Sequence, residues 1–161
     1  MSSLHKSMAK ISVEDKRKGA ATARVPMALD VPNIPGRKLF YAFDVSWEDL
    51  NKFVSTHWDD YFGTPYDLTD DLSRASAALQ ILQALSGFGS LNFANGVPNA
   101  SSAAHATNYP ACEGFDAVLL LRLCSSRRKS YARRPTQASY DRLADIIGRP
   151  AEWWVDFDTN C

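Results

Sequence analysis

The sequence predicts an α+β fold, a two-layer sandwich in which about three helices pack on one face of a three- to four-stranded sheet. Short runs rich in aromatic and aliphatic residues predict the strands, and segments with an apolar residue every three or four positions predict the helices. Along the chain these helices are inserted between the strands. A split βαβ, ferredoxin-like arrangement fits this order if residues 90–94 supply the second strand.

A single domain of about 125 residues, preceded by a tail, is the predicted organisation. Residues 1–36 form a basic segment without apolar periodicity, and Pro26, Pro32 and Pro35 lie close together in it. Proline at this density disfavours helix and favours extended chain. We therefore expect a flexible tail over residues 1–36 and one α+β domain over residues 37–161.

The first strand is expected at residues 38–45, which have the aromatic content and the length of a strand. Ser46 then has the character of a helix N-cap, with Asp49 in the capping-box position three residues later. Spacings of three and four predict one apolar stripe on this helix, made of Trp47, Leu50, Val54, Trp58 and Tyr61.

A second helix is expected to open at Thr69 and to end at Gly87, a residue type that favours helix C-termini. Asp70 and Asp71 fall in its first turn, where carboxylates interact favourably with the helix dipole. Its predicted buried face consists of Leu72, Ala75, Leu79, Leu82 and Leu85.

The second half of the chain is predicted to add two strands and one more helix. Residues 115–124 are apolar without alternation, as in a strand buried on both faces. A helix follows between an N-cap at Thr136 and a stop at Gly148, and residues 152–158 form the last strand. Residues 95–114 are rich in Asn, Ser and Ala, which predicts a long loop that is either disordered or a lid.

Charge is balanced overall but segregated along the chain. There are 18 basic and 18 acidic residues, which argues against a surface committed wholly to DNA or to an anionic membrane. Residues 44–71 nevertheless hold eight acidic residues against one lysine, and residues 122–149 hold eight bases against two acids. Such segregation produces local fields or pairs across the fold.

Composition also bears on cofactors and on compartment. The three cysteines lack metal-ligand spacing, and neither a zinc motif nor a calcium loop is present in the sequence, so we expect no cofactor and no metal. The odd cysteine count, without a signal peptide or an apolar run of membrane-spanning length, predicts a cytoplasmic protein, with the nucleus as the alternative, and no membrane partner.

One cluster has residue types suited to acid–base catalysis. A histidine falls in the second half of the first helix, and carboxylates and aromatic residues stand near it in sequence. A nearby carboxylate would orient the imidazole and shift its titration across neutral pH. The enzyme hypothesis for a small-molecule substrate therefore rests on His57, Asp44, Asp59, Asp60 and Tyr61.

The run CSSRRKSYARR, residues 124–134, is the strongest concentration of positive charge. Two arginines precede Ser130 at the spacing that basophilic kinases read, which makes this serine a phosphorylation candidate. Nucleic acid is an alternative ligand, but the run lacks the glycine–aromatic pattern of an RNA-recognition sheet. The candidate binding residues here are Arg127, Arg128, Lys129, Arg133 and Arg134.

Adjacent tryptophans in the last strand must point to opposite faces. We expect Trp153 to enter the core and Trp154 to be exposed at a binding surface. Because no catalytic motif is assembled in the sequence, the leading hypothesis is a small intracellular domain that binds a protein partner or self-associates. An enzyme using His57 is the alternative, and nucleic-acid binding through residues 127–134 is the second alternative.

Overall fold

The computed structural model describes residues 25–98 and 117–160. Over these residues the protein has mixed α and β structure, as the sequence predicts. The elements, in chain order, are β1 (Leu39–Asp44), α2 (Trp47–Tyr61), α3 (Asp71–Ser86), β2 (Asn92–Pro98), β3 (Val118–Ser125), α5 (Arg128–Tyr131), α6 (Gln137–Ile147), β4 (Glu152–Asp156) and α7 (Phe157–Asn160).

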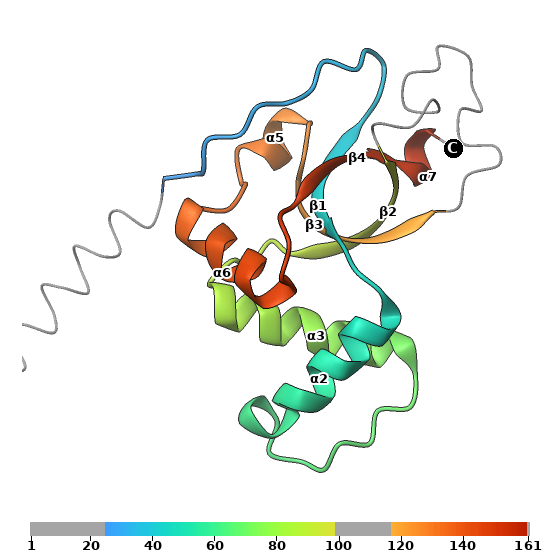
Figure 1. Ribbon diagram of the computed structural model, residues 1–161, viewed down its shortest axis with the longest axis vertical. Helices are drawn as coiled ribbons and strands as arrows, with labels where there is room; N and C mark the ends of the chain where they lie inside the picture. Colours follow the sequence, from blue (N-terminus) through green and yellow to red (C-terminus); the bar gives the residue numbers. More distant parts are fainter. Residues whose placement is uncertain (1–24, 99–116, 161) are drawn as a thin grey trace, which may run out of the picture.

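The four strands close into a barrel in the order β1-β3-β2-β4, with every pair antiparallel (Figure 1). The expectation of an open sheet covered on one face is therefore corrected. Closure is possible because β2 extends to residue 98, beyond the expected 90–94, so that Val97 can pair with Val155 of β4. At Gly96 a Cβ atom would lie 2.5 Å from Leu120 Cδ1 and 3.1 Å from the Val155 carbonyl oxygen, so a larger residue there would require these neighbours to move.

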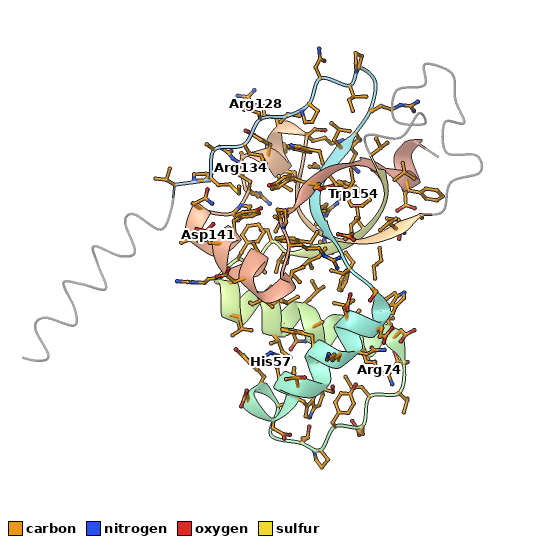
Figure 2. The ribbon with its side chains drawn as sticks, in the orientation of Figure 1. His57, Arg74, Arg128, Arg134, Asp141 and Trp154 are labelled. Carbon is orange, nitrogen blue, oxygen red and sulfur yellow. The ribbon has the colours of Figure 1, made fainter. Side chains whose placement is uncertain are left out.

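The interior of the barrel is filled by one face of each strand. Side chains alternate along a strand, and those facing away from the helices form a compact cluster of Phe40, Ala42, Leu120 and Trp154. The expectation that Trp154 is exposed is wrong. This residue is 8 % exposed, and its indole Nε1 donates to the Ala42 carbonyl oxygen at 3.2 Å (Figure 2).

The helices α2, α3 and α6 lie together on one side of the barrel (Figure 1). Ser46 caps α2 as predicted, since its side chain accepts the backbone N–H of Asp49 at 3.0 Å. The inner face of α2 is Leu50, Val54 and Trp58, whereas Trp47 and Tyr61 at the two ends of the predicted stripe are exposed. The stripe is shorter than predicted because the core reaches only the middle of the helix.

The second helix also differs in detail from its sequence pattern. Asp70, rather than Thr69, is the N-cap of α3, and its carboxylate accepts the Ser73 N–H at 2.8 Å. Leu72, expected to be buried, is 79 % exposed. Ala75 and Leu82 are buried as predicted, and Leu79 and Leu85 are partly buried. The buried face is completed by Ala77, Ala78, Ile81 and Ser86, and its alanines let α3 pack closely.

Residues 25–36 are attached to the domain, so the expected flexible tail to residue 36 is corrected for this part. Met27 is buried, and its N–H donates to the Pro135 carbonyl oxygen at 2.8 Å. The Tyr131 hydroxyl donates to the Leu29 carbonyl oxygen, and Trp153 Nε1 donates to that of Asp30 at 2.8 Å. Residues 1–24 and most of the expected loop, residues 99–116, lie outside the described residues.

Gly87 and Gly148 end α3 and α6 with positive φ, as their positions predict. The last strand stops two residues early, at Asp156, because the Asp156 carboxylate accepts the Asp158 N–H at 3.1 Å and α7 begins there. Of the helices described, none has the length and apolar character needed to cross a bilayer.

Candidate functional site

A cavity of about 480 Å³ lies between α2 and the end of α6. Its α2 wall is formed by residues spaced three or four apart, which face the same way on a helix. Apolar side chains make its floor, and charged or polar groups stand at its edge. The lining residues are Val45, Asp49, Leu50, Lys52, Phe53, Thr56, His57, Leu82, Ile146, Ile147, Gly148 and Arg149.

Arg149 organises the carboxylates at this edge. Its position follows from Gly148, whose left-handed conformation ends α6 and directs the next residue across to α2. The guanidinium lies 3.3 Å from an Asp44 oxygen and 3.7 Å from an Asp49 oxygen. Because all three groups are substantially exposed, these pairs orient the edge of the cavity more than they stabilise the fold.

Of the five residues of the enzyme hypothesis, only His57 lines the cavity. Its ring packs against that of Phe53, with centroids 4.7 Å apart, and no carboxylate of the described residues forms an ion pair with it. Asp44 is engaged by Arg149 instead. Asp59, Asp60 and Tyr61 are exposed on α2 outside the cavity lining.

The residues that sequence reasoning missed at this cavity fall into two groups. Asp49 and Thr56 share the His57 side of α2, so the helical spacing contained the signal that places them there. Arg149 is nearly 100 residues away from them in sequence, and no local pattern indicates that it meets Asp44.

A second group of polar residues forms around the short helix α5. Arg127, Arg128, Lys129 and Arg133 are exposed, and we call these four residues the basic surface. Among the described residues no carboxylate lies within ion-pairing distance of any of them. Figure 2 places Arg128 on the same side of the molecule as Arg134.

Arg134 differs from its neighbours because it is tied to the backbone. Its Nε donates to the Met27 carbonyl oxygen at 2.6 Å, and one of its terminal nitrogens donates to that of Tyr131 at 3.0 Å. The guanidinium also lies 4.2 Å from the centre of the Tyr131 ring. Arg134 therefore holds residues 25–30 in place. The prediction from sequence that Arg134 is a binding residue does not account for these contacts.

Ser130 is partly buried on the inner side of α5. Its Oγ accepts the backbone N–H of Ser125 at 2.8 Å, which fastens the short helix to the end of β3. The candidate phosphorylation site thus has a structural hydrogen bond in the folded domain.

Nucleophilic chemistry has little support in the described part of the chain. The Cys124 thiol is buried, and burial raises its pKa to about 11, opposed in part by Arg134 and Arg122. Its thiolate is therefore scarce near neutral pH. Nor do the described residues contain a group of three His, Cys, Asp or Glu side chains placed to hold a metal ion.

Comparison with known protein families, with curated proteins and with solved structures finds no match to this chain.

Proposed function

We propose that this chain is an intracellular binding domain that recognises an acidic protein partner through the basic surface. The observation that carries the proposal is the set of four exposed cations, Arg127, Arg128, Lys129 and Arg133, which have no carboxylate partner in residues 25–98 and 117–160. Complementary charge on a partner accelerates association and selects against wrong partners.

Three acids of the acidic segment, residues 44–71, have basic partners elsewhere in the same molecule. Asp44 and Asp49 face Arg149, and Asp71 lies 3.4 Å from Arg74. Among residues 25–98 and 117–160, then, no acid pairs with the basic surface, which supports a partner on a separate molecule. A second copy of the chain is included among such partners, because Glu48, Asp59, Asp60 and Asp67 are exposed acids on every molecule.

The test measures binding of a fluorescent Glu-rich peptide at low and at high salt. The double variant Arg127→Gln/Arg128→Gln is expected to weaken binding about tenfold, since both changes remove cations from the contact. The double variant Lys52→Gln/Arg142→Gln changes net charge equally on exposed residues elsewhere and should leave binding within about twofold. Equal weakening by both pairs would indicate an effect of net charge alone and would contradict the proposal.

Two further measurements distinguish the other partners. Sedimentation velocity at both salt concentrations detects self-association, which the Arg127→Gln/Arg128→Gln variant should reduce if a second copy is the partner. An oligonucleotide tested on the same variants addresses nucleic acid, whose affinity should fall steeply with salt. Binding of an oligonucleotide but not of the acidic peptide would replace the proposal by its nucleic-acid alternative.

A small-molecule site is the second candidate function, and the 480 Å³ cavity at His57 favours it. Volumes of this order suit small ligands, and the cavity combines an apolar floor with few polar groups. No carboxylate of the described residues forms an ion pair with His57. An acid–base role for this residue therefore requires that the bound ligand supply the partner of the imidazole. Fragment binding followed through the His57 imidazole resonances tests the site. Thr56→Trp, which adds bulk at the exposed rim, should abolish that binding.

A further inference from the structure

A second cavity, of about 320 Å³, lies where α5 meets the turn that precedes β2 and the middle of β3. It is lined by Ser90, Arg122, Leu123, Lys129, Ser130 and Arg133. Three of these six residues are cations, two carry hydroxyl groups and none is acidic. The cavity thus joins two residues of the basic surface to Arg122, a residue of the barrel that lies outside the basic run.

Arg122 is held in place by the barrel itself. Its backbone pairs with Ala42 of β1 on one side and with Asn92 of β2 on the other. The guanidinium carbon lies 5.1 Å from the centre of the ring of Phe40, which is buried. Such stacking orders the side chain without consuming its charge. No ion pair with a carboxylate of the described residues engages it.

Ser130 adds a hydroxyl group to the same cavity. Its Oγ already accepts the Ser125 N–H at 2.8 Å, and it lines the cavity beside the three cations. Because the oxygen is used as an acceptor, the hydroxyl hydrogen is left to donate. The four donors around the cavity therefore come from β3, from α5 and from the turn that follows α5. Contacts with Phe40 and with Ser125 hold two of them, Arg122 and Ser130, in place.

We propose that this cavity is a binding site for a phosphate monoester, with Arg122, Lys129, Arg133 and Ser130 as its ligands. Three cationic residues line it, and three positive charges exceed what one carboxylate neutralises. A phosphate monoester carries a charge of about −1.5 to −2 and three acceptor oxygens, which match several donors at once. If the ligand is a phosphorylated acidic protein, this inference rests on the proposed function. It then adds that the phosphoryl group is the feature of the partner that is recognised.

The experiment compares three probes of the full chain: inorganic phosphate, an acidic peptide containing phosphoserine, and the same peptide with unmodified serine. We expect inorganic phosphate to shift the amide resonances of residues 122 and 129–133, with chloride at equal ionic strength as the control. We expect the phosphoserine peptide to bind about tenfold or more tightly than its unmodified form, as charge-assisted bonds of this kind predict.

Two variants separate the cavity from the surrounding charge. Arg122→Gln should remove the preference for the phosphoserine peptide while leaving binding of the unmodified peptide within about twofold. Arg128→Gln, whose residue does not line the cavity, should weaken both peptides by the same factor. If Arg122→Gln unfolds the chain, Ser90→Glu provides a second variant, because its exposed carboxylate would compete for the same cations.

The outcomes for the two proposals differ. Binding of both peptides with equal affinity would overturn the phosphate site and leave the acidic-partner proposal standing. Shifts with inorganic phosphate and no binding of either peptide would support the site and overturn the acidic partner, identifying a small phosphorylated molecule as the source. Absence of any response to phosphate or to either peptide would overturn both.

Discussion

Arg134 Nε lies 2.6 Å from the carbonyl oxygen of Met27, a residue 107 positions earlier in the chain. This bond joins the basic run to the segment that precedes β1, and the Tyr131 hydroxyl makes a parallel bond to the Leu29 carbonyl oxygen. A cation of the run thus has an architectural role, in contrast to the exposed cations beside it.

Replacing Arg134 by alanine is expected to release residues 25–30 from the domain. Hydrogen bonds to charged groups contribute about 1.5–3 kcal/mol each, so the local free energy of opening should fall by that order. Hydrogen exchange of the Met27 amide, which donates to the Pro135 carbonyl oxygen, is the direct measurement. The exposed Arg133→Ala is the control, and equal acceleration of Met27 exchange in both variants would contradict the role of Arg134.

Gly96→Ala should destabilise the barrel by about 1–3 kcal/mol, the usual cost of overpacking a core. The added Cβ would lie 2.5 Å from Leu120 Cδ1 and 3.2 Å from Trp154 Cβ, and Leu120 is fully buried. Gly63→Ala is the matched control because nothing lies within 4 Å of its added Cβ. Urea denaturation of the two variants measures the difference, and similar midpoints would be inconsistent with a closely packed barrel interior.

Trp154→Ala should lower the free energy of unfolding by about 3–5 kcal/mol, as expected when a large aromatic side chain is removed from a core. Trp47→Ala removes a tryptophan that is 41 % exposed and should cost much less. Chemical denaturation followed by far-UV circular dichroism compares them without relying on tryptophan fluorescence. A smaller loss at Trp154 than at Trp47 would mean that Trp154 does not fill the barrel.

Stability should fall at alkaline pH because of two buried groups. Burial raises the pKa of the Cys124 thiol from 9.0 to about 11, and burial together with the Tyr140 hydroxyl raises the pKa of Tyr41. The unfolded chain loses the thiol proton at lower pH than the folded chain does. The contribution of the protonated thiol to the free energy of unfolding is therefore fully present below about pH 9. It is lost as pH rises towards 11, by at most about 1.4 kcal/mol per pH unit.

Cys124→Ala tests the thiol's share of this effect. Between pH 9 and 10, below the ordinary pKa of tyrosine, the variant should show a flatter dependence of unfolding free energy on pH than the unmodified chain. Denaturant midpoints across this interval provide the measurement. Parallel curves for the two proteins would show that Cys124 titrates alike in the folded and unfolded states.

Ser130 is expected to be a poor kinase substrate in the folded domain. Its Oγ accepts the Ser125 N–H, and the serine lies within α5 rather than in an extended segment. A peptide covering residues 124–134 should be phosphorylated by a basophilic kinase faster than the intact chain. Mapping of the products distinguishes phosphate on Ser130 from phosphate on Ser126, a neighbouring serine whose Oγ accepts the Leu39 N–H at 3.0 Å. Equal rates on peptide and protein would contradict this expectation.

The sequence by itself determined the elements whose signals are local. Ser46 and Thr136 cap their helices, and Gly87 and Gly148 end theirs, as predicted. These contacts join residues three or four positions apart, so they form wherever the local sequence permits them. The run of cations at residues 127–134 is likewise recognisable from its order in the chain. Its order does not, however, distinguish Arg134, which bonds to backbone carbonyl oxygens, from the four exposed cations.

Only the tertiary structure decided which faces are covered and which distant residues meet. The alternation of side chains along a strand correctly places Trp153 and Trp154 on opposite faces. In a closed barrel, however, the inner face is buried as well, and Trp154 lies on that inner face. The ion pair of Arg149 with Asp44, and the cavity shared by Arg122, Lys129 and Arg133, depend on strand pairing and on the packing of helices against the barrel. Closure is set by backbone pairing between β2 and β4, which are more than 50 residues apart, and by the space that Gly96 leaves. Local periodicity cannot specify such contacts, because it records the faces of one element and not the element that will cover them.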